Sequence, residues 1–100
     1  MGLRIWLDDV RPMPKGFDIW CKTADDCLYF VRHDNVEHIS FDHDLGQSDG
    51  SGYFVASVID GMAYSKEVNQ ISWDIHSANP VGRKNIEAAM KSAERFWNIK

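Results

Sequence analysis

The sequence is poor in cysteine and in basic residues, and each shortage excludes a class of protein. The chain of 100 residues has only two cysteines, Cys21 and Cys27, whose spacing matches neither a disulfide framework nor a zinc motif. Lys and Arg number 11 against 15 Asp and Glu, which gives a formal net charge of −4. Affinity for duplex DNA depends on a field of cationic side chains, so we expect no duplex DNA partner.

Long apolar runs and targeting segments are also missing. No stretch approaches the roughly 20 residues that cross a bilayer, so we expect no membrane partner. The N-terminal segment reaches the acidic pair Asp8 and Asp9 too early for a signal peptide. No internal repeat, low-complexity tract or change in composition divides the chain. We therefore expect a single domain over residues 1–100. Because no disulfide framework is indicated, we expect that domain in a reducing cytoplasm.

What is present is an alternation of apolar strands and amphipathic helices. Hydrophobic content is 44%, enough for one compact core. Apolar runs predict strands over 3–7, 17–22, 36–41 and 70–77. Capping residues predict helices after Thr23 and after Asn79, the first ending near Asp34, with a helix between them that follows a flexible loop over 46–52. The predicted inner stripe of that middle helix is Phe54, Val55, Val58, Ile59 and Met62.

The predicted strands end in polar residues. Strands that alternate with helices form mainly parallel sheets, whose carboxyl ends gather at one edge. Alternation places His76 with Ser72 and Asp74 on the opposite side of its strand from Trp73. One edge of the sheet is therefore expected to carry Asp8, Asp9, Asp42, His43, Asp44, His76 and Ser77.

Carboxylates gathered in this way repel one another unless a cation neutralises them, which predicts a divalent metal site. An all-oxygen set suits Mg²⁺ or Mn²⁺, and the candidates for it are Asp8, Asp9, Asp42 and Asp44. The neighbouring imidazoles of His43 and His76 also leave room for a metal that prefers nitrogen. The alternative is that aspartates such as Asp8 and Asp44 only stabilise turns.

The segment after His76 has the composition of an anion site. A hydroxyl, an amide and the free N–H groups of a new helix follow one another there, with two cations in the first turns, and phosphate is the expected anion. These side chains are Ser77, Asn79, Arg83 and Lys84, and Arg11 is placed to clamp the same phosphate. The alternatives are an ordinary capped helix with solvated cations, and an Arg11 that neutralises Asp8 or Asp9. His33 and His38 have no spacing that indicates chemistry.

The segments LDDVRP (7–12), ISFDHDLG (39–46) and HSANPVGRKN (76–85) resemble the cyclic-phosphate processing receiver-like domain family, which is related to response-regulator receivers. The resemblance covers nearly the whole chain. It implies a three-layer α/β sandwich with a four-stranded, mainly parallel, flavodoxin-like sheet that lacks the fifth strand and helix of a full receiver. In receivers, an acid pair corresponding to Asp8 and Asp9 binds Mg²⁺, and the phosphoaccepting aspartate corresponds to Asp42.

Departures from the receiver pattern argue against phosphorelay signalling. The lysine that ends a fifth strand is absent, while His43, Asp44, His76 and the Asn79–Arg83 stretch are additions. The resemblance implies binding or opening of a cyclic phosphate instead. We therefore expect a metal-assisted phosphodiesterase that acts on an RNA 2′,3′-cyclic phosphate end or on a cyclic nucleotide signal, in a bacterial cell or as a phage counter-defence protein.

In this reading the residues have three roles. Metal binding is assigned to Asp8, Asp9, Asp42 and Asp44, and phosphate binding to Arg11, Ser77, Asn79 and Arg83. Catalysis is assigned to His43, His76 and Asp42, since histidine holds either proton state near neutrality. The alternatives are a noncatalytic module that sequesters a cyclic nucleotide or phosphate ligand, a divergent phosphorelay receiver, and a haloacid dehalogenase-type phosphatase suggested by Asp42 and Asp44.

Overall fold

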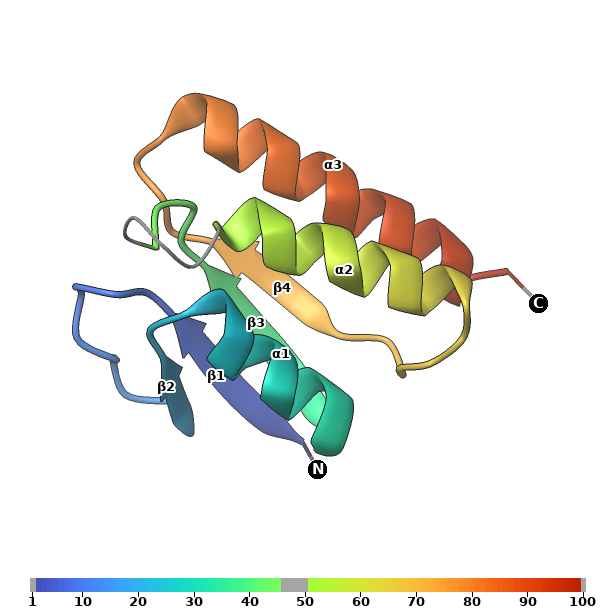
Figure 1. Cartoon of the computed structure of the whole chain (residues 1–100), viewed down its shortest axis with the longest axis horizontal. Helices are drawn as coiled ribbons and strands as arrows, with labels where there is room; N and C mark the ends of the chain where they lie inside the picture. The colour runs from blue at the N-terminus through green and yellow to red at the C-terminus, as the bar shows by residue number, and fades with distance from the viewer. Residues whose placement is uncertain (1, 46–50, 100) are drawn as a thin grey trace.

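The computed structural model describes residues 2–45 and 51–99 and contains four strands and three helices (Figure 1). In chain order these are β1 Leu3–Leu7, β2 Ile19–Cys21, α1 Ala24–His33, β3 Val36–Phe41, α2 Gly52–Tyr64, β4 Ser72–Ile75 and α3 Pro80–Trp97. The order of elements is the one that the apolar pattern predicts. The second and fourth strands are shorter than the apolar runs that indicate them, because strand pairing stops before the runs do.

All strand pairs in the sheet are parallel, and the strand order is β2-β1-β3-β4. The register places Leu7 beside Cys21 and Phe41, and Phe41 beside Ile75. The carboxyl ends of the strands therefore meet at one edge, which confirms the receiver-like parallel sheet.

The layers differ from those of a three-layer sandwich. Both helical crossovers, β2-α1-β3 and β3-α2-β4, advance across the sheet in the same direction, and right-handed crossovers then place their helices on the same face. The β1–β2 connection has no helix, and α3 packs against α2 and β4. Among the described residues the helices thus cover one face of the sheet (Figure 1).

Side chains alternate between the two faces of each strand. Ile5, Leu7, Ile39 and Phe41 point toward the helices and are fully buried in a single core. The alternate positions on β1, β3 and β4 carry tryptophan, histidine, serine and aspartate on the face without helices, namely Trp6, His38, Ser40 and Asp74. The sheet therefore has an apolar face and a polar face.

The helix starts are set by capping side chains. Thr23 accepts a hydrogen bond from the N–H of Asp26, and Asn79 accepts one from the N–H of Gly82, as the sequence predicts. Ser51 caps α2 in the same way, so Gly52 belongs to a helix and not to the loop predicted over 46–52, and residues 46–50 lie outside the described part of the chain.

The predicted inner stripe of α2 is wrong at one residue. Phe54 is 48% exposed, because the buried face of α2 runs through Val55, Ile59 and Met62, and Phe54 is rotated about 100° away from Val55. The buried side chains beside that stripe are those of the smaller residues Ala56 and Ala63.

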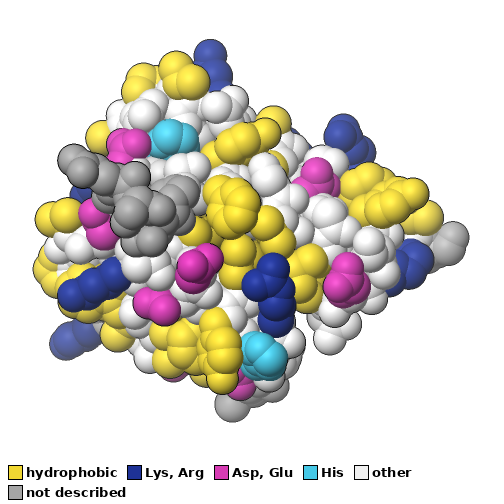
Figure 2. Space-filling view, in the orientation of Figure 1, with side chains coloured by type: hydrophobic (Ala, Val, Ile, Leu, Met, Phe, Trp, Pro, Cys, Tyr) yellow, Lys and Arg dark blue, Asp and Glu magenta, His cyan; other side chains and the backbone are white. Residues whose placement is uncertain are grey.

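The surface carries mixed charge. On the face shown in Figure 2, Lys and Arg side chains are dispersed among acidic and apolar ones. Within the described residues, no helix combines the length and the apolar character that crossing a bilayer requires.

Candidate functional site

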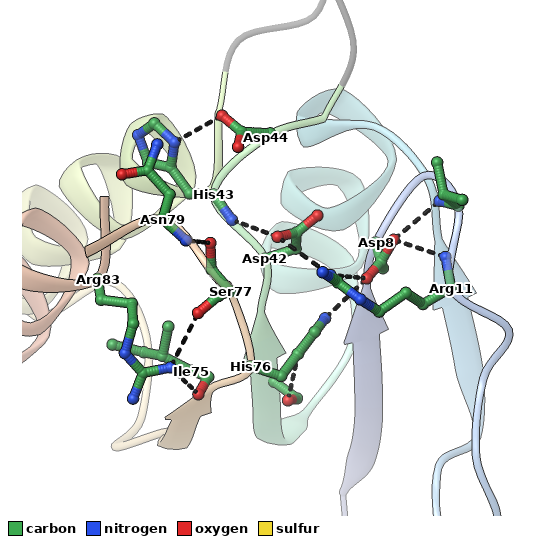
Figure 3. Close-up of polar contacts among 12 residues, drawn as sticks. Asp8, Arg11, Asp42, His43, Asp44, Ile75, His76, Ser77, Asn79 and Arg83 are labelled. Carbon is green, nitrogen blue, oxygen red and sulfur yellow. Dashed lines mark hydrogen bonds and ion pairs between the residues drawn. The ribbon is translucent and has the colours of Figure 1, made fainter. Parts of the chain in front are cut away.

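Asp8 follows β1 directly, and its carboxylate is completely buried. Its Oδ1 accepts hydrogen bonds of 2.8 Å from the backbone N–H groups of Val10 and Arg11. Its Oδ2 lies 3.0 Å from Arg11 Nη1 and 2.9 Å from His76 Nε2 (Figure 3). Burial would raise the pKa of Asp8, but these donors together hold it below its usual value.

Asp42 follows β3 and is only 6% exposed. Its Oδ1 accepts a 2.9 Å hydrogen bond from the N–H of His43 and lies 3.5 Å from Arg11 Nη1. Burial, followed by the negative charge of Asp8, raises the pKa of Asp42 above its usual value, and Arg11 offsets only part of this. Within one site, the pKa of Asp8 is thus lowered and the pKa of Asp42 is raised.

His76 follows β4 and lies flat on Trp6, with ring centroids 3.8 Å apart and planes 7° from parallel. Its Nε2 faces Asp8, and its Nδ1 is 2.8 Å from Ser40 Oγ. The stacking and the two polar contacts fix the imidazole in both position and rotation.

Two indole N–H groups hold the loop after β1. Trp6 Nε1 donates to the carbonyl of Arg11 at 2.9 Å, and Trp20 Nε1 donates to the carbonyl of Asp8 at 2.7 Å. In the sequence alone these tryptophans are indistinguishable from apolar bulk. The alternation of β1 and β2 could have shown that both point to the polar face, but not that they bind this loop.

The structure brings the acids and one histidine together. One ligand atom each from Asp8, Asp42 and His76 lies within 4.8 Å of the others, a grouping suited to a metal ion. Asp9 and Asp44 line the same pocket, although Asp44 is 73% exposed and accepts from His43 Nδ1 at 2.9 Å. The donor set closest to the centre is therefore two carboxylates and an imidazole.

The pocket above this cluster has a volume of about 390 Å³. Its far wall is the start of α3, where Ser77 Oγ accepts from the N–H of Asn79 and Asn79 Oδ1 accepts from the N–H of Gly82. Ala78 completes this wall. A helix start, with its positive dipole end, thus faces the carboxylates across the pocket.

Two predicted site residues lie away from the pocket. The ring of His43 is directed toward α3, where it packs so closely that a Cβ on Gly82 would fall 2.3 Å from its Cγ. Arg83 Nη1 donates to the carbonyls of Ile75 at 2.9 Å and Ser77 at 3.1 Å, at the end of the edge strand (Figure 3). The placement of Arg83 follows from carbonyl groups that need partners, which a motif does not reveal.

A profile of the cyclic-phosphate processing receiver domain matches residues 3–92. The chain belongs to this family. All the residues of the pocket lie within the matched range, as do the three motifs on which the resemblance rests. Comparisons with curated proteins and with solved structures gave no match. The family ties this receiver-like domain to the processing of cyclic phosphates.

Proposed function

We propose that the protein is a metal-dependent phosphodiesterase that opens a cyclic phosphate, on an RNA 2′,3′-cyclic end or in a small cyclic nucleotide. The observation that carries the proposal is the grouping of Asp8, Asp42 and His76 within 4.8 Å, opposite the start of α3. Cleaving a phosphodiester needs positive charge at the nonbridging oxygens, an oriented water and a proton for the leaving oxygen. The pocket has a group for each need.

The residues present fit a divalent cation. Asp42 is buried beside a second carboxylate, and that neighbouring charge disfavours its ionised form, a cost that a cation would remove. Asp8 and Asp42 would hold the ion, and Asp9 and Asp44 add negative charge on the pocket wall. When bound, a divalent ion such as Mg²⁺ or Mn²⁺ would supply Lewis-acid charge beside the phosphate.

Phosphate binding is assigned to Arg11 and to the start of α3. The guanidinium of Arg11 is half exposed and lies 3.0 Å from Asp8, at the mouth of the pocket. Ser77, Ala78 and Asn79 form the opposite wall, where polar groups and the helix dipole favour an anion. Arg83 is given a structural role here, because its guanidinium binds the end of β4.

Proton transfer is assigned to His76. Its Nε2 lies 2.9 Å from Asp8 Oδ2, and a ligand atom of the ring lies within 4.8 Å of Asp42, so at the floor of the pocket it would exchange a proton with a water or a leaving oxygen. The ring of His43 is directed toward α3 and away from this cluster, so it acts through the loop that carries Asp42.

The proposal is tested by hydrolysis of a panel of cyclic dinucleotides and 2′,3′-cyclic mononucleotides, with and without a chelator. We expect turnover that the chelator abolishes and that His76→Ala lowers by on the order of a hundredfold or more. His33→Ala, in a histidine outside the pocket on α1, is the matched control and should leave the rate unchanged.

Three results would overturn the proposal or its assignment of His76. Ligand that is bound but released intact after denaturation would show a sequestering module. Loss of manganese binding in His76→Ala would make His76 a metal ligand and remove it from proton transfer. A hydroxylamine-sensitive phosphate adduct on Asp42 would point to a receiver or an aspartyl phosphatase instead.

A further inference from the structure

The indole of Trp6 contacts two groups of the proposed site with two different parts of its side chain. The face of the ring stacks on the imidazole of His76, with centroids 3.8 Å apart and planes 7° from parallel. The edge of the ring carries its single donor, Nε1–H, which donates to the carbonyl of Arg11 at 2.9 Å. Trp6 thus links the end of β4 to the loop after β1, two segments that lie far apart in the sequence.

The imidazole of His76 lies across β3. This strand separates β4 from β1, and neighbouring strands are about 4.8 Å apart, so side chains of β4 and β1 meet only by leaning over the strand between them. The residue of β3 in register with Trp6 is Ser40, whose small side chain leaves this space open. Ser40 Oγ lies 2.8 Å from Nδ1 at the rim of the imidazole. Ser40 therefore holds one atom of the ring, and the indole supports its plane.

The indole is itself held in place. Trp6 is only 9% exposed, and the ring of Phe17 packs against it with centroids 5.3 Å apart and planes at 64°. The guanidinium of Arg4 lies over Phe17, 5.6 Å from its ring centroid, and Arg4 Nε donates to the carbonyl of Gly16 at 2.9 Å. The indole therefore changes rotamer only if the segment before β2 moves as well.

We propose that Trp6 is a positioning residue for both His76 and Arg11, an inference that rests on the proposed roles of these two residues in proton transfer and phosphate binding. The ring face sets the plane of the imidazole, and Nε1–H holds the backbone of Arg11, whose guanidinium reaches Asp8 at 3.0 Å. Because one rigid ring makes both contacts, it fixes the distance between the proton-transfer group and the phosphate clamp. Trp20 makes a similar bond, from its Nε1 to the carbonyl of Asp8, so the two indoles hold both ends of the segment from Asp8 to Arg11.

The alternative is that Trp6 only fills the face of the sheet that has no helices. Both roles predict a loss of stability when the indole is truncated, because a large buried ring is removed. The roles differ when the ring is kept and its N–H alone is removed. A filling role then leaves the site unchanged, whereas a positioning role releases Arg11 and leaves His76 stacked.

The kinetic test compares two variants of the full chain with the wild type on the panel of cyclic substrates. Benzothienylalanine at position 6, introduced by chemical synthesis, keeps the shape of the indole and replaces its N–H by sulfur. We expect this variant to raise KM by about 2- to 10-fold, the scale of one neutral hydrogen bond, with kcat unchanged. Trp6→Leu removes the ring as well, so we expect kcat to fall in addition by about 10- to 100-fold, the scale on which residues that orient a functional histidine act.

Two further variants control the experiment. Trp97 Nε1 donates to the carbonyl of Val68 at 3.1 Å, which is the same kind of bond at the end of α3 and outside the pocket, so Trp97→Phe should leave kcat and KM unchanged. Trp6→Phe retains a ring that can stack on His76 and should keep more of kcat than Trp6→Leu does. Circular dichroism and thermal melts identify any variant that does not fold, and the benzothienylalanine variant preserves the packing if Trp6→Leu does not.

Order parameters from NMR relaxation test the positioning without reference to turnover. In full-length, metal-free protein we expect wild-type values near about 0.85, typical of a rigid backbone, for the amides of Val10 and Arg11. The benzothienylalanine variant should lower both values and leave the ¹³C relaxation of the His76 ring unchanged. Trp6→Leu should increase the mobility of the His76 ring as well.

Three outcomes separate the inference from the proposed function. Unchanged order at Arg11 and His76 in the folded variants would overturn the inference, even with full hydrolysis in the wild type. Equal kcat and KM in an active wild type and both position-6 variants would overturn it as well. A wild type that hydrolyses nothing, but in which Arg11 and His76 gain mobility as expected, would overturn the proposed function and leave the assignment of Trp6 standing.

Discussion

At the scale of single residues, two buried aspartates of one site contribute to stability with opposite signs. Asp8 has a lowered pKa, so its charge adds stability that is present above its ordinary pKa of 3.8 and lost as the pH falls through the lowered value. Asp42 has a raised pKa, so it adds stability below 3.8 that is lost as the pH rises through the raised value. At neutral pH, Asp8 therefore stabilises the metal-free fold and Asp42 destabilises it.

This contrast predicts opposite effects of two isosteric substitutions. In metal-free protein at neutral pH, Asp42→Asn should raise Tm and Asp8→Asn should lower it. A change on the order of 1 kcal/mol corresponds to about 4–8 °C for a domain of this size. The gain in Asp42→Asn should shrink as the pH falls, because wild-type Asp42 then becomes protonated. Differential scanning calorimetry across pH measures both effects, and a fall in Tm for Asp42→Asn would contradict the assignment.

The guanidinium of Arg11 contacts the carboxylate oxygens that would bind a metal ion. Its Nη1 lies 3.0 Å from Asp8 Oδ2 and 3.5 Å from Asp42 Oδ1. We therefore expect Arg11→Gln to bind Mn²⁺ more tightly, by about tenfold if the competition is worth about 1.4 kcal/mol, and yet to turn over substrate more slowly. Arg4→Gln, on β1 and paired with Glu37 outside the pocket, is the control. Titration calorimetry that shows weaker binding in Arg11→Gln would exclude this competition.

At the scale of elements, the start of α3 is pressed against the loop that carries Asp42. A Cβ at Gly82 would meet three atoms of His43 at 2.3–2.7 Å, so the chain has no room for a side chain there. A close approach of this kind sets the distance between the two walls of the pocket. Any side chain at position 82 would collide with His43, which explains why a glycine lies inside α3 at this position.

We expect Gly82→Ala to destabilise the protein by about 1–3 kcal/mol through overpacking and to lower turnover by displacing α3 from the pocket. Gly61→Ala is the matched control, since Gly61 also lies within a helix and nothing described is within 4 Å of its added Cβ. That control should gain about 0.5–1 kcal/mol from helix propensity. Urea denaturation measures both, and equal stabilisation of the two variants would contradict the proposed contact.

At the scale of the whole molecule, the apolar pattern predicts much of the fold because strand and helix periods are properties of the chain itself. The meeting of Asp8, Asp42 and His76 is also predictable, since each follows a parallel strand and such strands end at one edge. The placement of the helices on one face of the sheet was not predictable from the motifs. It depends on the strand order, which the local pattern around β1 and β2 does not contain.

The direction of individual side chains was the other unpredictable part. Arg83 has the sequence context of a phosphate ligand, but its guanidinium satisfies carbonyls at the end of β4. Ser40 looks like any small residue in a strand, but the sheet places its hydroxyl in contact with Asp74 and His76. Contacts between strands that are far apart in sequence leave no local signal at either residue.

A metal ion bound between β1 and β3 should stabilise the molecule as a whole. If the metal binds only the folded state, a concentration of about 100 times its Kd adds roughly 2.7 kcal/mol to the free energy of unfolding. We expect Mn²⁺ to raise Tm in the wild type and to have no such effect in Asp8→Asn. Thermal melts with and without metal test this, and an unchanged wild-type Tm at saturating Mn²⁺ would argue against a metal site.

The alternation of side chains along β1, β3 and β4 places the packed core and the polar contacts of the site on opposite faces of the sheet. Residues that point toward the helices, such as Ile5 and Phe41, keep the domain folded, while their immediate neighbours Trp6 and Ser40 serve the pocket from the other side. Substitutions on the polar face leave the helix-facing core in place, but they fall on side chains that are themselves buried, such as Trp6 and Ser40. A library restricted to the exposed positions of the polar face should therefore retain a high proportion of folded proteins.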